Sequence, residues 1–347
     1  MTPSFETFQF FVYQVENWYK THYRPLPWRE EPSPYHIWLA EIIFQQTRIE
    51  QGMGYYVRFV EKYPNIQLLA SAPEDEILRM WQGLGYYSRA LNLHKTAKII
   101  ANKGGNFPNN VEELKKLPGI GPYTAGAIAS IAFGKRSPLV DGNVQRVLSR
   151  FFGIDAPVND SKSLAHFYTL ADQLVKICEN PSYFNQGLMD LGSLICKPSK
   201  PKCIECPLAS MCYAEARQLT DVLPVRKSAP KKTNRYMLYG FYDNNGIIAV
   251  QKRGANDIWK NLYQLPLLLD TFDEKIAMDF VNTHLKKLNP FNIKHILSHQ
   301  VLHIRIFTLQ KLPLIEESDT FIFMPKDELS DLGFPVPFQK FFSKISE

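Results

Sequence analysis

Three features are scarce or missing in this sequence, and each one removes a class of protein. No long run of uncharged apolar residues occurs, which argues against a membrane-spanning helix. The first residues lack a basic segment followed by an apolar one, so no secretory signal peptide is expected. Only five cysteines are present, and in the reducing compartment that we infer they are not expected to form disulfides.

The composition is that of a globular protein with two domains. The chain has 347 residues, of which 45% are hydrophobic and 21% are charged. This is enough apolar material to build a core in each domain. The formal net charge of +6 suits a polyanionic partner. Neither an internal repeat nor a low-complexity tract interrupts the chain.

The stretch LPGIGPYTAGAIA, residues 117–129, contains the most informative motif of the sequence. Residues 111–117 predict a short helix that Pro118 ends, and the small residues further on predict a closely packed second helix. Gly119 and Gly121 allow a hairpin that a Cβ would obstruct. Backbone N–H groups at the start of the second helix form an anion site. The motif is therefore a helix-hairpin-helix, whose usual ligand is a nucleic-acid phosphate; an ordinary turn between core helices is the alternative.

Glu41 is the only charge in the apolar run IWLAEIIF, residues 37–44. Ser33 and the proline after it predict the start of a helix that continues to about Gln51. A carboxyl in this helix is either paired and structural, or it lies in a dry pocket with a raised pKa. Desolvation favours the protonated form, which is the form that a general acid needs near neutral pH.

Two further stretches carry side chains suited to nucleic acid. Gln46 and its neighbours are expected on the same helix as Glu41, where amides either mark a solvated end or contact bases. The segment WQGLGYYSRA, residues 81–90, predicts a turn of two glycines, two tyrosines and an arginine. Such a turn suits stacking and phosphate contact. A glycine turn with packed tyrosines is the alternative.

Asp141 follows an apolar segment and precedes a predicted helix, in the sequence LVDGNV. Its side chain is suited to capping that helix. Arg146 and Arg150 lie one turn apart on the same helix and give its other face positive charge.

Four cysteines follow the spacing C-x6-C-x2-C-x5-C, and lysines lie between them; they are Cys196, Cys203, Cys206 and Cys212. Four thiolates so close together suit a [4Fe–4S] cluster or a structural zinc ion. Zinc sites usually show two Cys-x-x-Cys pairs, and only one is present here, so the spacing favours the cluster. The remaining cysteine, Cys178, lies among apolar residues and is expected to be a buried core thiol.

The character of the chain changes after the cysteines. Residues 216–234 are basic and interrupted by proline, which predicts a linker between domains. Strand-like periodicity follows at residues 236–242, 247–252 and 301–309, and residues 273–288 predict a helix. The sequence thus predicts a small α+β second domain.

In combination these segments resemble the DNA glycosylase superfamily that includes endonuclease III, and in finer detail the adenine DNA glycosylases of the MutY kind. The matching segments cover most of residues 20–215, namely 26–28, 41–47, 83–90, 117–129, 141–143, 184–192 and the four cysteines. The second domain matches more weakly, through residues 259–266 and 297–299.

The resemblance implies a multi-domain fold. Residues 1–215 are expected to form an all-α helix-hairpin-helix glycosylase domain with an iron–sulfur loop at 196–212. Residues 216–234 are the basic linker. Residues 235–347 are expected to form an α+β, Nudix-like domain that recognises 8-oxoguanine. The glutamate-rich Nudix pattern Gly-x5-Glu-x7-Arg-Glu is missing after Leu269, so recognition rather than hydrolysis of a nucleotide pyrophosphate is expected of it.

The resemblance also implies the roles of residues. Glu41 is the expected acid at N7 of adenine. Asp141, at a polar helix start, is expected to stay ionised and to stabilise an oxocarbenium-like sugar. Tyr123 and Asn143 are expected to organise the site around the two carboxyls. The residues expected to contact DNA are the wedging Gln46 and Tyr86, the phosphate-binding Gly119 and Gly121, and the 8-oxoguanine readers Ser298 and His299.

The implied reaction is hydrolysis of adenine from DNA, without strand cleavage. Tyr123 stands where lyase-type relatives carry a Schiff-base lysine. The expected partner is double-stranded DNA with adenine opposite 8-oxoguanine or guanine. We expect a monomer that acts in the bacterial cytoplasm, at the nucleoid, with a [4Fe–4S] cluster that positions its basic loop. The alternatives are an endonuclease III-like pyrimidine-lesion glycosylase with lyase activity, a nucleotide pyrophosphohydrolase, and a structural DNA-binding protein.

Overall fold

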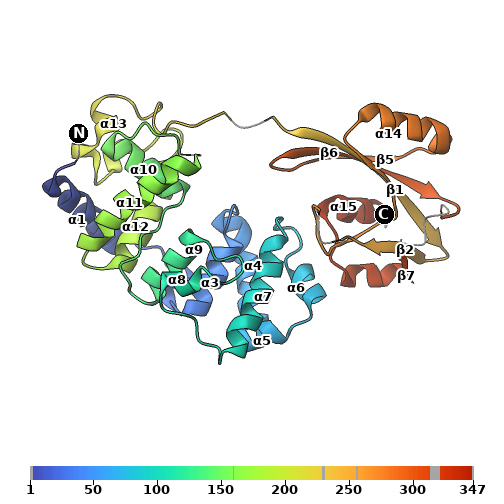
Figure 1. Cartoon of the computed structure of the whole chain (residues 1–347), viewed down its shortest axis with the longest axis horizontal. Coiled ribbons are helices and arrows are strands. Elements are labelled where there is room, and N and C mark those ends of the chain that lie inside the picture. The colour runs from blue at the N-terminus through green and yellow to red at the C-terminus, as the bar shows by residue number, and fades with distance from the viewer. Residues whose placement is uncertain (1–2, 159, 229–230, 255–256, 313–320, 346–347) are drawn as a thin grey trace. The chain divides into compact units, whose positions relative to one another are not determined.

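The computed structural model describes residues 3–158, 160–228, 231–254, 257–312 and 321–345. The chain forms two compact units, one of Met1–Ala70 with Lys95–Ser228 and one of Ser71–His94 with Ala229–Glu347. The first unit is helical and the second combines helices with a sheet (Figure 1). This agrees with the predicted fold class. Segment 71–94 groups with the second unit, and residues 229 and 230 of the predicted linker lie outside the described residues.

Short helices joined by turns make up the first unit. They are α1 Phe5–His22, α2 Pro27–Glu30, α3 Pro34–Ile43, α4 Ile49–Lys62, α5 Ile66–Ser71, α7 Ser88–Asn102, α8 Val111–Leu114, α9 Pro122–Ala127, the π-helical turn η1 Ile128–Ala132, α10 Gly142–Phe152, α11 Ser161–Ile177, α12 Pro181–Leu194, the 3-10 turns η2 Cys203–Glu205 and η3 Ala209–Met211, and α13 Tyr213–Ala216. Helices α5 and α7 each continue into the segment that groups with the second unit.

The apolar face of α1 is buried against helices distant in sequence. Ser4 caps α1 by accepting a hydrogen bond of 3.2 Å from the N–H of Thr7. The ring of Phe11, which is fully buried, lies 4.8 Å from the ring of Phe151 in α10 and 6.4 Å from that of Phe184 in α12. Helices α1, α10 and α12 therefore share one core.

The helix expected from Ser33 to about Gln51 is two helices, so the prediction of a single one is wrong. Helix α3 ends at Ile43, and α4 begins at Ile49. Gln46 lies in the turn between them with a φ of 59°, a left-handed conformation that cannot continue a helix. The ring of Phe44 packs 4.7 Å from Trp28 and 6.4 Å from Tyr56 of α4. Packing of this ring against Trp28 and Tyr56 stabilises the turn between the two helices.

The predicted helix-hairpin-helix is present as α8, a turn and α9. Gly119 has a φ of 75°, so glycine is favoured there by its backbone. The hydroxyl of Thr96 holds the turn by donating a hydrogen bond of 2.8 Å to the carbonyl of Pro118. Gly121 differs from the prediction, because its φ is −86° and a Cβ would meet no atom within 4 Å. No atom of the described residues requires glycine at that position.

The second unit contains a seven-stranded mixed sheet. Its main path runs β3-β2-β1-β6-β5, while β4 pairs with β1 and β7 pairs with β2. Strands β1 and β6 are parallel, and the other pairs are antiparallel. The strands are β1 Thr233–Asn244, β2 Ile247–Lys252, β3 Tyr263–Gln264, β4 Leu267–Thr271, β5 Phe291–Ile296, β6 Gln300–Leu309 and β7 Phe321–Pro325.

Helices contribute to two separate cores in this unit. Phe338 of α15 (Val336–Ile345) packs edge-on to Tyr239, with ring centres 4.9 Å apart. The second core joins Leu238 and Phe307 of the sheet to Leu285 of the π-helical turn η4 (Val281–Leu285), which continues α14 (Glu274–Phe280). The unit also contains α6 (Glu74–Met80) and the 3-10 turn η5 (Lys326–Asp331). An α+β second part was predicted, and this is confirmed.

Among the described residues, no helix has the length and apolar character needed to cross a membrane.

Candidate active site

A cavity of about 1030 Å³ opens in the first unit, between helices that come from distant parts of the chain. Its lining draws on α2, α3, α9, α12, the start of α10 and the turn after α3. The four residues predicted to act in catalysis all line it; they are Glu41, Tyr123, Asp141 and Asn143. The fold therefore brings together side chains that lie up to about a hundred positions apart in the sequence.

Glu41 lies near the end of α3 and is half-buried at the cavity wall. Its pKa is raised from 4.5 to about 7, mainly because burial disfavours the charged form. A hydrogen bond from Tyr123 and the charge of Arg29 act in the opposite direction, while Asp141 adds to the rise. At neutral pH a large share of this carboxyl carries a proton, which corresponds to the second of the two alternatives that the sequence left open for Glu41.

Tyr123 is the second residue of α9, and its hydroxyl faces the cavity between two acceptors. It lies 3.4 Å from Sδ of Met189, to which it donates a hydrogen bond. It is also hydrogen-bonded to Glu41. Burial, and then the charges of Glu41 and Asp141, raise the pKa of Tyr123 well above its ordinary value of 10. The phenol therefore keeps its proton at physiological pH.

Asp141 is the N-cap of α10, as its position in the sequence predicted. Its carboxylate accepts a hydrogen bond of 2.7 Å from the N–H of Val144 and one of 2.8 Å from Nδ2 of Asn143. Burial nevertheless raises its pKa from 3.8, and these bonds and Arg146 only offset that rise. Asp141 was expected to stay ionised because it lies at a polar helix start; burial of the side chain acts against the charged form, and the hydrogen bonds act in its favour.

Arg146 holds Asn143 in place. Its Nη2 donates 2.8 Å to Oδ1 of Asn143 and 2.7 Å to the carbonyl of Gly192, and its Nε donates 2.6 Å to the carbonyl of Cys196. Arg146 can make these hydrogen bonds because α12 packs closely on α10. A Cβ on Gly192 would lie 2.7 Å from Cβ of Asn143, a distance that real structures do not show.

Sequence reasoning missed a buried ion cluster in the cavity wall. Asp190 of α12 is fully buried and pairs with the guanidinium groups of both Arg24 and Arg29. Each arginine donates two hydrogen bonds to it, which satisfies both carboxylate oxygens. One signal was available, since Asp190 is the only acidic residue in α12, just as Glu41 is in α3.

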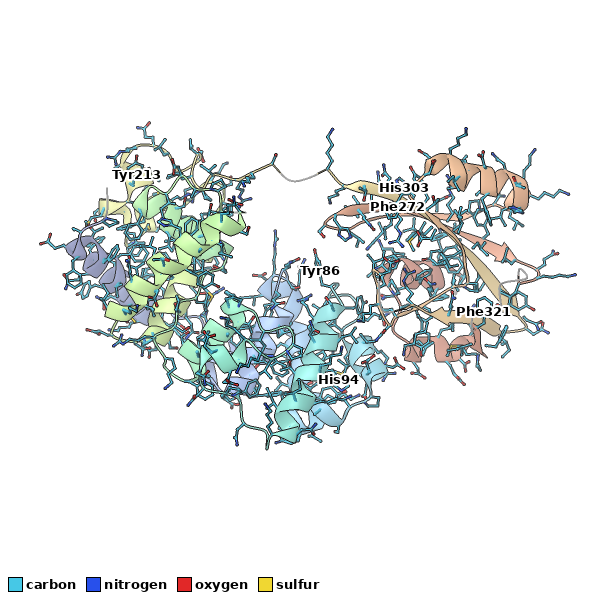
Figure 2. All side chains as sticks on the ribbon, in the orientation of Figure 1. Tyr86, His94, Tyr213, Phe272, His303 and Phe321 are labelled. Atoms are coloured by element: carbon cyan, nitrogen blue, oxygen red, sulfur yellow. The ribbon has the colours of Figure 1, made fainter. Side chains whose placement is uncertain are left out.

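The two residues predicted to wedge into DNA share one backbone property. Gln46 and Tyr86 are both exposed and both left-handed, with φ of 59° and 48°. Tyr86, labelled in Figure 2, is 49% exposed. Left-handed conformations cost energy for residues with a Cβ. These two side chains are thus presented to solvent at sites where the backbone conformation is an unfavourable one.

Arg89, the arginine of the turn that contains Tyr86, stabilises that turn. Nη2 of Arg89 donates to the carbonyls of Leu84 and Gly85, at 3.2 and 3.1 Å. Its guanidinium also lies 5.0 Å from the ring of Trp81. Burial lowers its pKa to about 10. Arg89 is therefore a structural part of the glycine turn.

Ser298 and His299 form the exposed turn between β5 and β6 in the second unit. The hydroxyl of Ser298 lies 3.2 Å from Nδ1 of His299. The carbonyl of His299 accepts a hydrogen bond of 3.1 Å from the N–H of Thr233. Leu297 packs against the core of the sheet. The turn is thus anchored on both sides while its two polar side chains stay accessible.

The four cysteines expected to hold a cofactor lie half-buried around the turns η2 and η3. Burial, and then neighbouring groups that include the thiolate of Cys196, raise the pKa of the other three, Cys203, Cys206 and Cys212. In the part of the chain that the structure describes, no three His, Cys, Asp or Glu side chains form a site for a single metal ion. The fifth cysteine, Cys178, is 2% exposed, so the predicted core thiol is confirmed.

Arg150 places a positive charge against the cysteine loop, which suits the binding of a negatively charged group there. It is 2% exposed, and its Nη1 donates to Sγ of Cys196 at 3.3 Å and to the carbonyl of Lys197 at 2.7 Å. Its Nη2 and Nε hold the carbonyls of Thr220 and Leu223. A donor to a cysteine sulfur and four thiols in one short loop match the chemistry of iron–sulfur ligation. A multi-iron cluster also holds its sulfurs farther apart than a single ion does.

Three family models match the chain. Residues 39–171 match the HhH-GPD superfamily of base excision DNA repair proteins. Residues 196–212 match the iron–sulfur binding domain of endonuclease III, which contains all four cysteines of the loop. Residues 237–344 match the NUDIX domain. These matches confirm the predicted order of a helix-hairpin-helix domain, an iron–sulfur loop and a Nudix-type domain.

Individual proteins give the same result. The adenine DNA glycosylase of Buchnera aphidicola subsp. Baizongia pistaciae is 36% identical over 346 residues, which cover 97% of each chain. The human adenine DNA glycosylase is 42% identical over 211 residues, which cover 58% of this chain and 38% of the human one. The solved structure of a thermostable thymine-DNA glycosylase matches with a TM-score of 0.56 and 32% identity, covering 61% of this chain and 98% of that one.

Proposed function

Because the chain belongs to the adenine DNA glycosylase family, we propose that it hydrolyses the N-glycosidic bond of adenine in duplex DNA and so starts base excision repair. One observation carries the proposal: Glu41 and Asp141 line the same cavity in different hydrogen-bonding environments. Paired carboxyls with different environments are the recurrent solution for cleaving glycosidic bonds.

A base inside a duplex is out of reach of these carboxyls, so the adenine must leave the stack. The cavity of about 1030 Å³ has room for a flipped nucleotide. Exposed Gln46 and Tyr86 are suited to occupy the space that the base leaves. Gly119 and Gly121 belong to the turn that leads into α9, and the N–H groups at the start of α9 are suited to bind the DNA backbone.

Glu41 supplies the proton that turns adenine into a good leaving group. A raised pKa of about 7 keeps the acid form populated near neutral pH. The proton goes from the Glu41 carboxyl to N7 of adenine, and the electrons of the glycosidic bond leave with the base. Glu41, now a carboxylate, is available to activate the water that attacks the sugar.

Asp141 stabilises the sugar cation that forms when the bond breaks. Two hydrogen bonds, from Val144 and Asn143, favour its charged form and fix its orientation. Arg146 fixes Asn143 in turn. Tyr123 and Asn143 are positioning residues for the two carboxyls. Since Tyr123 cannot form a Schiff base, the product is an intact strand with an abasic site.

Recognition of the opposite base is assigned to the second unit. Ser298 and His299 present two polar side chains on an anchored turn, which suits reading of 8-oxoguanine or guanine opposite adenine. We propose the domain limits 1–215 and 235–347 with a linker at 216–234, and a monomer that acts on DNA in the bacterial cytoplasm.

The cysteine loop fits a [4Fe–4S] cluster held by Cys196, Cys203, Cys206 and Cys212. When bound, the cluster supplies a rigid, negatively charged centre for the loop rather than redox chemistry in base removal. Arg150 would offset part of that charge through its bond to Cys196. The basic residues of the loop, Lys197, Lys200 and Lys202, would then be held for contact with phosphates.

The test is to identify the product. A duplex with adenine opposite 8-oxoguanine should yield free adenine and an abasic strand that breaks only after alkali treatment. Borohydride should trap no covalent adduct. Release of an oxidised pyrimidine instead, or an adduct formed as fast as base release, would favour the endonuclease III-like alternative.

A further inference from the structure

The hydroxyl of Tyr123 has one proton and two acceptors. It donates to Sδ of Met189 at 3.4 Å and is also hydrogen-bonded to the carboxyl of Glu41. A phenol has one O–H to donate and lone pairs to accept with. The thioether of Met189 has no proton, so it can only accept. The direction of the hydroxyl therefore depends on the protonation of Glu41.

We propose that the Met189 thioether is the resting acceptor of the Tyr123 proton, which leaves the Tyr123 oxygen free to accept the protonated Glu41 carboxyl until Glu41 gives its proton to the base. Met189 is thus a positioning residue for the acid step, and this inference rests on the proposed function. Met189 belongs to α12, lines the cavity and is partly exposed to it, so its sulfur is beside the reacting groups.

The arrangement satisfies both states of the acid. Before the reaction, Glu41 is protonated and donates to the oxygen of Tyr123, while Tyr123 donates to Met189. The Glu41 proton then moves to N7 of adenine, and Glu41 becomes a carboxylate. Tyr123 keeps its own proton and turns its O–H from sulfur to the new carboxylate. Without the sulfur, the phenol would donate to Glu41 at all times, which favours the charged form that cannot act as an acid.

Other charges around Glu41 stay the same in both states. Helix α3 packs against α2, α4, α9 and η1. Helix η1, with the sequence IASIA, has no ionisable side chain. Several ionisable groups face Glu41 or line the same cavity. They are Arg29 of α2, Arg48 and Glu50 at the start of α4, Tyr123 of α9, Asp141 and Arg146 at α10, Lys197 after α12, and Arg24 with Asp190 in the ion cluster. Arg24 and Arg29 are paired with Asp190, so neither responds to the Tyr123 proton.

The test is the pH dependence of single-turnover adenine release by the full-length protein, from a duplex with adenine opposite 8-oxoguanine. Met189→Leu removes the acceptor at nearly constant volume. In the pH–rate profile of this variant, we expect the fall in rate at alkaline pH to occur about half a pH unit lower than in wild type. A shift of this size corresponds to the free energy of a weak net hydrogen bond. The rate on the acid side should change less than about twofold. Met189→Gln restores an acceptor oxygen, so the alkaline fall in rate should return to the wild-type pH or move to a higher pH.

Tyr123→Phe provides the matched background, because it removes the hydroxyl that Met189 is proposed to act through. In that background Met189→Leu should cause no further shift. A uniform loss of rate at all pH values, an unchanged profile, or a shift that persists in the Tyr123→Phe background would overturn the inference. Wild-type protein that releases no adenine would instead overturn the proposed function.

Discussion

Nε of Arg146 donates a hydrogen bond of 2.6 Å to the carbonyl oxygen of Cys196. The same guanidinium holds Asn143 at 2.8 Å, and Asn143 donates 2.8 Å to the carboxylate of Asp141. These bonds connect the carboxylate at the start of α10 to the first cysteine of the loop. The planar guanidinium of an arginine can donate hydrogen bonds to acceptors in several directions at once, which the single ammonium of a lysine cannot do in the same geometry.

Arg146→Lys should therefore slow adenine release by about ten- to a hundredfold, or roughly 1.4–2.7 kcal/mol in the barrier. The positive charge stays, but Asn143 and Asp141 lose their fixed orientation. Single-turnover rates measure the loss. Arg136→Lys is the control, because Arg136 also donates to backbone carbonyls, those of Val175 and Cys178, outside the residues that line the cavity. An equal loss in both variants would contradict the role of Arg146.

Glu41→Gln should reduce base release by about a thousandfold, the usual worth of a general acid. Binding of the duplex should persist, since the amide has nearly the same shape. A gel-shift assay and a single-turnover assay separate the two effects. Glu50→Gln is the matched control, because this exposed carboxyl lines the same cavity. Near-normal turnover by Glu41→Gln would remove Glu41 from the mechanism.

The same substitution should change how stability depends on pH. In the folded protein the pKa of Glu41 is about 7, above the ordinary value of 4.5. Stability from this group is fully present below pH 4.5 and is lost as the pH rises through 7, because the folded state must then hold a buried charge. The amide of the variant cannot ionise. The unfolding free energy of Glu41→Gln minus that of wild type should therefore be about 2 kcal/mol larger at pH 8 than at pH 5. Thermal melts at both values test this, and an equal difference at both would contradict it.

The cysteines should divide into ligands and one core residue. Cys203→Ala should abolish the visible absorbance of an iron–sulfur cluster and lower the Tm of the first unit. Cys178→Ala is the control, since this thiol is buried and donates to the carbonyl of Val175. It should keep the full absorbance and lose only packing energy. Full absorbance in Cys203→Ala, or its loss in Cys178→Ala, would contradict the assignment.

Local patterns in the sequence predicted the helix-hairpin-helix, the cap at Asp141, the buried Cys178 and the α+β second part. Each depends on residues that are neighbours in the chain, where spacing and capping rules apply. The prediction of one helix through Gln46 was wrong because the packing of Phe44 on Tyr56 of α4 is a tertiary contact. Local helix propensity could not reveal it.

Long-range contacts account for the parts of the site that the sequence did not predict. Asp190 meets Arg24 and Arg29 across 166 and 161 positions, and no local pattern joins such residues. The contact between Tyr123 and Met189 likewise spans 66 positions. The lone acid in an apolar helix was a usable signal for Asp190, as it was for Glu41. Its arginine partners became evident only once the helices were assembled.

The most direct test of the proposed function compares single-turnover adenine release from three duplexes, with adenine opposite 8-oxoguanine, guanine and thymine. We expect fast release from the first two and little from the third. We also expect Ser298→Ala with His299→Ala to lower the preference for 8-oxoguanine while release opposite guanine continues. No release from any of the three duplexes, by protein that retains its cluster absorbance, would show that the chain is not an adenine glycosylase of this specificity.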